Sequence, residues 1–124
     1  MGGDGVERSH EPQEVRIVRL DEALWCKASG QAHSLIEGDR ALSAGVFQFK
    51  PGQRVPEEGF TAHEGTEVSL VLSGEVTLGL EDQSERTVRG GELVIIPRGV
   101  PHYSYNPGSQ AAHIVWVIAA AVEL

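Results

Sequence analysis

The sequence has little cysteine, few basic residues and no long apolar run. Its one cysteine, Cys26, cannot form an internal disulfide, which excludes a disulfide-stapled secreted scaffold. Ten Lys and Arg against 18 Asp and Glu give a net charge of −8, which argues against a protein that binds nucleic acid or anionic membranes. No apolar stretch reaches the roughly 18 residues of a membrane span, and no apolar signal-peptide core precedes residue 14. We therefore expect a cytoplasmic protein without nucleic-acid or membrane partners.

Glycine and proline, by contrast, are plentiful. The length of 124 residues suits one domain. The 15 glycines and 6 prolines predict many turns, which suit short strands better than long helices. Because residues 1–14 are polar, glycine-rich and aperiodic, we expect a flexible leader over 1–14 and a single domain over 15–124.

Alternating apolar and polar residues predict about eight to ten short strands. Asp21 is a candidate cap for one helical turn that follows it, and Ser73-Gly74 is expected to form a hairpin turn. No helix longer than about 10 residues is expected, so the fold class is all-β, a sandwich or a closed barrel. The expected strands cover residues 15–20, 41–50, 67–72, 75–80, 85–89, 92–96 (as a buried strand), 102–106 and 111–122.

Polar side chains at strand positions suggest a metal site. Residues an even number apart on an extended strand share a face, so Thr61, His63 and Glu67 can point the same way. With His102, they offer two imidazoles and one carboxylate, a donor set that suits transition metals. On spacing alone, two partly buried histidines without a metal explain the pattern equally well.

Two sequence motifs add to this spacing. Residues 91–106 fit G-x5-P-x-G-x2-H-x3-N without a departure, and this segment resembles the second signature motif of the cupin family. Residues 67–74 fit E-x6-G, the end of the first cupin motif, G-x5-H-x-H-x3-E-x6-G, in which His63 takes the place of the second histidine. The resemblance implies a double-stranded β-helix, or jelly-roll barrel. It also implies one divalent transition metal (Fe, Mn, Ni, Cu or Zn) on His63, Glu67 and His102.

The sequence departs from the cupin pattern at two positions. Thr61 stands where the first motif has its first histidine, and Val55 where it has its leading glycine. Because a threonine hydroxyl is a poor ligand for a transition metal, at most three of the four expected ligands remain, unless Glu57 or Glu58 replaces the fourth. Two interpretations stay open. Three ligands hold a metal with open positions, as in catalytic sites, or a degenerate site only binds a small molecule.

The resemblance leaves two classes of function. One is a metal-dependent enzyme that acts on a small metabolite, since similar single-domain proteins include dioxygenases, isomerases, lyases and cyclases; its general base would be Glu67, if unligated, or His113. The other is a non-catalytic ligand-sensing or binding module. The expected contacts to a small-molecule substrate are Thr61, Gln48, Ser69, Ser104 and His113.

Several of these positions have a second interpretation. His113 is better explained as a hydrogen-bonded barrel histidine than as a pocket residue, and Gln48 is equally explained as a solvated side chain. Trp25 and Trp116 are expected in the core or at an interface. A homodimer is also expected, because a jelly roll of this size leaves strand edges and apolar outer faces to cover.

Overall fold

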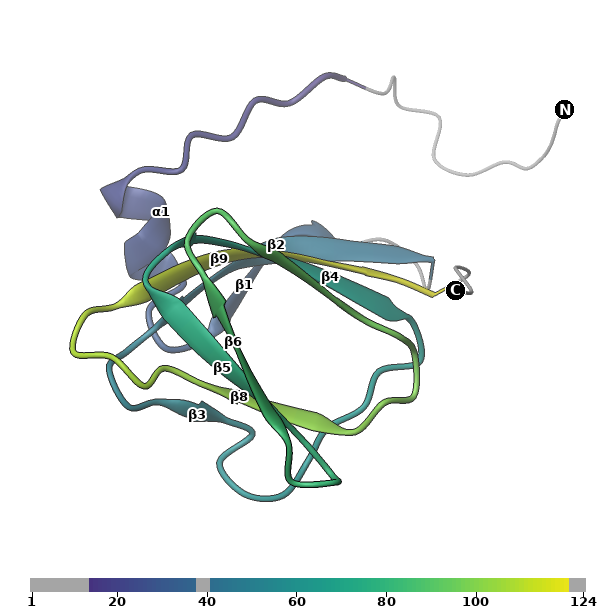
Figure 1. Cartoon of the computed structure of the whole chain (residues 1–124). Coiled ribbons are helices and arrows are strands. Elements are labelled where there is room, and N and C mark those ends of the chain that lie inside the picture. Colours follow the sequence, from purple (N-terminus) through teal and green to yellow (C-terminus); the bar gives the residue numbers. More distant parts are fainter. Residues whose placement is uncertain (1–13, 38–40, 121–124) are drawn as a thin grey trace, which may run out of the picture.

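Two antiparallel sheets face each other in the computed structural model, which describes residues 14–37 and 41–120 (Figure 1). The five-stranded sheet has the order β1-β2-β9-β4-β7, and the four-stranded sheet the order β3-β8-β5-β6. This arrangement confirms the predicted all-β jelly-roll fold. The described strands are β1 (Ala32–Glu37), β2 (Leu42–Phe49), β3 (Arg54–Val55), β4 (Thr66–Ser73), β5 (Glu75–Leu80), β6 (Glu85–Arg89), β7 (Leu93–Ile96), β8 (His102–Tyr105) and β9 (Ala112–Ala119).

A single short helix, α1 (Glu22–Lys27), precedes the sheets in the described residues. It begins at Asp21, whose carboxylate accepts a hydrogen bond from the Leu24 backbone N–H at 3.1 Å. This bond satisfies one of the N–H groups that the first turn leaves unpaired, as the predicted cap requires. No helix in the described part of the chain is long and apolar enough to cross a membrane.

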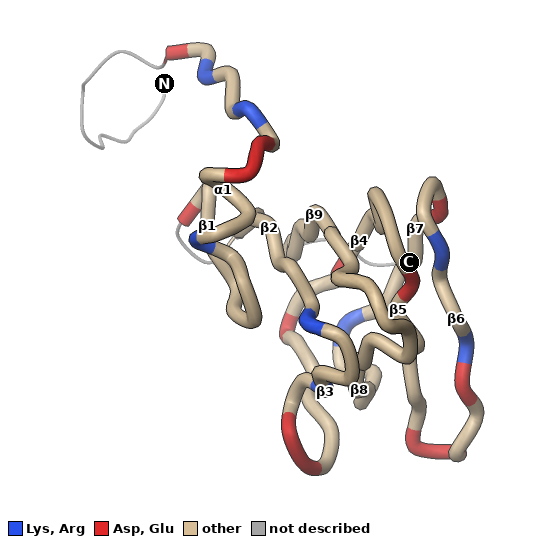
Figure 2. The backbone as a smooth tube through the Cα atoms, turned by 90° about the vertical axis from the view of Figure 1, so that its left-hand side faces the viewer, with Lys and Arg blue, Asp and Glu red and all other residues tan. Residues whose placement is uncertain are grey.

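The segment before α1 stands away from the sheets and pairs with none of the described strands (Figures 1 and 2). Residues 14–20 have no regular secondary structure, and Val15 and Ile17 are 95% and 94% exposed. The strand predicted at 15–20 is therefore wrong, because an alternating pattern forms a strand only where a neighbouring strand supplies hydrogen bonds. The leader predicted over 1–14 lies outside the described residues, except for Glu14.

The chain crosses from one sheet to the other between β4 and β5. β4 pairs with β7 and β9, whereas β5 pairs with β6 and β8, so the hairpin predicted at Ser73-Gly74 does not form. Gly74 has a φ of 81°, and a Cβ there would lie 2.9 Å from the Ala111 carbonyl oxygen. Glycine is needed at this corner both for the left-handed backbone and for the close approach.

Alternation along the strands separates the barrel interior from its outer surface. The interior cluster consists of Phe47, Phe49, Val71, Val76, Val88, Ala112 and Ile114. In β7, Val94 and Ile96 line the interior, while Leu93 and Ile95 are 52% and 51% exposed. The strand predicted at 92–96 is therefore buried on one face only.

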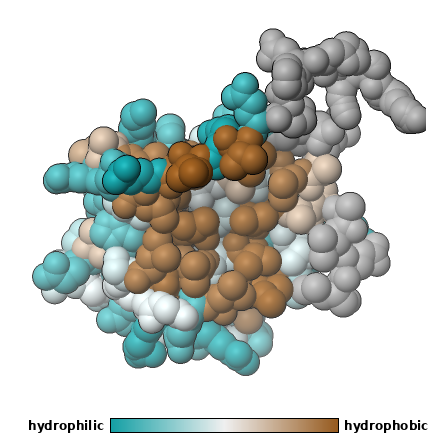
Figure 3. Space-filling view, turned by 90° about the horizontal axis from the view of Figure 1, so that it is seen from above, coloured by the Kyte–Doolittle hydropathy of each residue, from teal (hydrophilic) through white to brown (hydrophobic). Residues whose placement is uncertain are grey.

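The outer surface of the five-stranded sheet is also apolar. Val68 pairs with Val117 and Ile95, and Leu70 pairs with Val115 and Leu93, so these side chains lie side by side across β9, β4 and β7. Figure 3, seen from above Figure 1, shows apolar side chains gathered over this sheet. Leu24 and Ala28 at α1 cover part of the same sheet near β2. The outer apolar face is defined here as Val68, Leu70, Leu93, Ile95, Val115 and Val117.

Candidate metal centre

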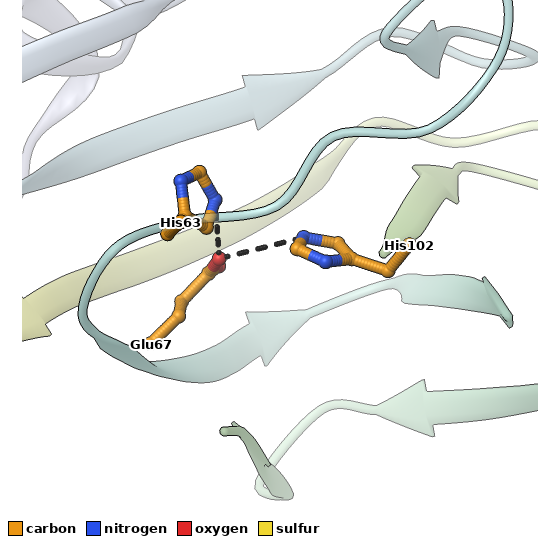
Figure 4. Close-up of side chains that lie close together, drawn as sticks. All are labelled: His63, Glu67 and His102. Atoms are coloured by element: carbon orange, nitrogen blue, oxygen red, sulfur yellow. Dashed lines mark ion pairs between the residues drawn. The ribbon is translucent and has the colours of Figure 1, made fainter. Parts of the chain in front are cut away.

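His63, Glu67 and His102 meet on the wall of one cavity between the two sheets (Figure 4). The Glu67 Oε1 atom lies 3.0 Å from His63 Nε2 and 3.7 Å from His102 Nε2. One donor atom from each residue lies within 4.8 Å of the others. Glu67 belongs to β4 and His102 begins β8, so the two sheets together position the cluster. The structure thus brings together the three residues predicted as ligands.

Neighbouring groups hold the donor atoms in place. The Ser69 hydroxyl donates a hydrogen bond to Glu67 Oε2 at 2.7 Å, which leaves Oε1 toward the histidines. His102 Nδ1 lies 2.9 Å from the Val100 carbonyl oxygen. Because a carbonyl can only accept, this contact places a proton on Nδ1 and makes Nε2 the atom that can bind a metal.

Thr61 lies directly beside His102. The backbone N–H of Thr61 donates to the His102 carbonyl at 2.9 Å, and the His102 N–H donates to the Thr61 carbonyl at 2.8 Å. Both side chains line the cavity. Position 61 is therefore adjacent to the cluster, whereas Glu57 and Glu58 are exposed and do not line the cavity. This placement argues against the alternative that one of these glutamates replaces the missing ligand.

Electrostatic contacts within the cluster favour the charged forms of Glu67 and His102. Burial alone would raise the pKa of Glu67, but interactions with His102, His63 and Ser69 outweigh burial and lower that pKa from 4.5 to about 2. Burial would likewise lower the pKa of His102, but its contacts with Glu67 and the Val100 carbonyl raise it. Glu67 is thus a permanent carboxylate at neutral pH, as a metal ligand must be.

The cavity has a volume of about 310 Å³. Besides the cluster, its polar groups are the hydroxyls of Thr61, Ser69 and Ser104, three residues that were predicted to contact a substrate, and the buried indole N–H of Trp116. The remaining wall is apolar and comes from both sheets. Its main side chains are Phe47, Phe49, Val55, Val71, Val76, Leu78, Val88, Val94, Ile96, Ile114, Trp116 and Ile118.

Two of the predicted substrate contacts lie elsewhere. Gln48 and His113 pair across β2 and β9, and neither lines the cavity. His113 Nδ1 lies 2.7 Å from the Ser73 hydroxyl, and its ring packs against Trp25 with centroids 4.6 Å apart. This corrects the expectation that His113 and Gln48 face a substrate in this cavity.

Trp116 is a cavity residue that sequence reasoning placed only in the core or at an interface. It alternates with His113, Val115 and Val117 on β9 and therefore faces the opposite side of the strand. The alternation was visible in the sequence. It did not show which face is inner, because both faces of β9 are largely apolar.

The geometry of the cluster fits a transition-metal ion. Ligands bound at about 2.1 Å to one ion, with tetrahedral or octahedral angles, lie about 3.0–3.4 Å apart. The separations of 3.0 and 3.7 Å from Glu67 lie close to this range. The third separation, between the histidine nitrogens, is at most 4.8 Å, so side-chain movements of about 1.4 Å or less bring all three ligands to one ion. Two imidazoles and one carboxylate suit first-row transition metals and leave coordination positions open.

The sequence of the chain is similar to proteins of one known family. A family model described as "Cupin domain" matches residues 45–118. The chain is 35% identical over 111 residues to oxalate oxidase 1 of Hordeum vulgare, an alignment that covers 84% of this chain and 50% of that protein. It is 30% identical over 118 residues to germin-like protein 3-3 of Oryza sativa subsp. japonica, covering 90% and 47%. The chain thus spans about half the length of the curated relatives it matches.

Solved structures give the same fold. A conserved protein of unknown function from Streptococcus pyogenes superimposes with a TM-score of 0.65 at 20% identity, covering 90% of this chain and 92% of that chain. An oxalate oxidase in complex with the substrate analogue glycolate superimposes with a TM-score of 0.56 at 27% identity, covering 68% and 44%. The first likeness concerns the fold alone.

Proposed function

The chain belongs to the cupin family, and from that membership we propose that His63, Glu67 and His102 hold one divalent transition metal in an enzyme that acts on a small metabolite. The observation that carries the proposal is the convergence of two imidazoles and one carboxylate on one cavity wall. An ion bound there supplies Lewis-acid or redox chemistry to a substrate that shares its coordination sphere. Ser69 and the Val100 carbonyl orient the ligands, and the apolar wall excludes water from the reacting groups.

The side chains of the cavity favour one of the predicted reaction classes. Among its described lining residues, the only titratable side chains are His63, Glu67 and His102. If all three bind the ion, none is left as a separate general base, and isomerases, lyases and cyclases commonly need one. We therefore favour an oxidoreductase of the dioxygenase type, for which His63, Glu67 and His102 would hold the ion and the ion would supply the redox chemistry. The similarity to proteins named oxalate oxidase supports an oxidoreductase.

A second candidate function is a non-catalytic ligand-binding module. The largely apolar wall of the cavity favours it, because such a wall binds a small molecule whether or not a metal is present. The two functions differ in turnover. Metal-loaded protein that binds candidate ligands but never consumes dioxygen in their presence would favour the binding module.

Purified protein is expected to take up about one divalent ion per chain. The metal-free chain would be incubated separately with Fe²⁺, Mn²⁺, Ni²⁺, Cu²⁺ and Zn²⁺, desalted, and analysed for metal content. Replacing the exposed Glu57 and Glu58 with glutamine is the control, because these residues lie outside the cavity and should leave the stoichiometry unchanged. If none of the five ions is retained, the metal-dependent function is wrong.

A further inference from the structure

Outside the metal cluster, the cavity offers a ligand almost no polar groups. Ser69 already donates its hydroxyl proton to Glu67. The hydroxyls of Thr61 and Ser104, on segments that contact or contain His102, therefore remain for a ligand. So does the indole N–H of Trp116, which pairs with Ser69 across β9 and β4 and has no hydrogen-bond partner among the described residues. A ligand thus meets few hydrogen-bonding groups, and most of the cavity wall is hydrocarbon.

Among the described residues, the charged side chains of the cavity also lie only in the cluster. No Lys or Arg is among the described residues that line it. Arg54 precedes the cavity residue Val55 but does not line the cavity. Its guanidinium lies over the Tyr103 ring, 3.9 Å from the centroid, and donates a hydrogen bond to the Pro56 carbonyl. A divalent ion beside the Glu67 carboxylate leaves a net charge of about +1 at the cluster. One anionic group on a ligand would neutralise that charge.

From these features we propose that the cavity binds a small monocarboxylate with a hydrocarbon body. The carboxylate lies at the His63–Glu67–His102 cluster, and the hydrocarbon packs against side chains such as Val76, Leu78 and Ile114. This proposal rests on the proposed metal site and defines its substrate class. A dicarboxylate is disfavoured, because its second carboxylate would be buried among apolar side chains with no cation to pair it.

A series of simple carboxylates tests this proposal. Acetate, butanoate, hexanoate and hexanedioate would be titrated calorimetrically into protein loaded with the ion that it retains. The Kd should fall about tenfold for every two methylenes from acetate to hexanoate, because each added methylene leaves water for the wall. Hexanedioate has the same chain with a second carboxylate and should bind at least about tenfold more weakly than hexanoate. A flat series, or hexanedioate binding as tightly as hexanoate, overturns the proposal.

A pair of matched variants tests where the hydrocarbon chain of the ligand binds. Val76 is 7% exposed and lines the cavity, whereas Val117 lies on the outer apolar face. Val76→Thr puts a hydroxyl on the wall and should weaken hexanoate binding about fivefold while acetate binding stays unchanged. Val117→Thr makes the same change outside the cavity and should alter neither affinity. Equal loss of hexanoate affinity in both variants contradicts the proposed position.

Failure of the metal site is distinguishable from failure of this proposal. Metal content is measured on each titrated sample, so a flat series with one bound ion overturns the substrate class alone. If no ion binds, the proposed function fails, and the wall is tested by titrating metal-free protein with ethanol and hexan-1-ol. Hexan-1-ol should bind at least about tenfold more tightly; equal binding overturns the role of the wall.

Discussion

Replacing His102 with alanine should lower the metal content from about one ion per chain to nearly none. His102 is 3% exposed, and its Nε2 faces Glu67 across 3.7 Å, so the substitution removes a buried ligand that no other described side chain can replace. Changing a group that merely orients a ligand typically costs 10–100-fold in metal affinity. Loss of the ligand itself should cost at least about 100-fold. Elemental analysis after desalting measures the effect.

The fold should survive this substitution. His102 pairs with Thr61 through backbone atoms alone, and alanine keeps both of those hydrogen bonds. The matched control is His113→Ala, which removes an imidazole from the outer side of the same barrel and should leave the metal content unchanged. If His102→Ala unfolds the protein while His113→Ala does not, His102 is a structural residue and the metal site is wrong.

The metal cluster was predictable because its residues are fixed by local rules. On an extended chain, even spacing places Thr61, His63 and Glu67 on one side, and the second motif supplies the corner that precedes His102. The structure adds what spacing cannot give. The distances between donor atoms, the Ser69 hydrogen bond and the tautomer of His102 all depend on contacts between strands distant in sequence.

Other features could not be predicted, because they depend on which strands become neighbours. Residues 15–20 alternate as a strand should, yet no strand pairs with them, while β1 forms from a segment with weak alternation because β2 pairs with it. Ser73-Gly74 has the sequence of a hairpin turn, but here it joins β4 of one sheet to β5 of the other. His113 has the right residue type for a site, and the apolar residues on both sides of β9 hid its outward orientation.

Replacing Thr61 with histidine should make the metal site tighter and the ligand site weaker. Thr61 is joined to His102 by two backbone hydrogen bonds and lines the same cavity. The Cβ of a histidine at position 61 would therefore lie next to the cluster. A fourth protein ligand should slow the loss of metal to a chelator at least about tenfold, because one more bond from the protein to the ion makes the ion bind more tightly. A tenfold change corresponds to about 1.4 kcal/mol. The new imidazole would occupy a position that an open site offers to a carboxylate, so acetate and hexanoate should both bind more weakly.

The control for this substitution is Thr61→Val, which keeps the side-chain shape and removes the hydroxyl. It should leave metal retention unchanged, because the hydroxyl is not expected to be a ligand, and it should weaken carboxylate binding only if the hydroxyl contacts the ligand head. Faster metal loss from Thr61→His than from the wild type would contradict the proposed geometry. Tighter metal together with weaker carboxylate binding would mean that the threonine keeps a coordination position free, at a cost in metal affinity, for a ligand to occupy.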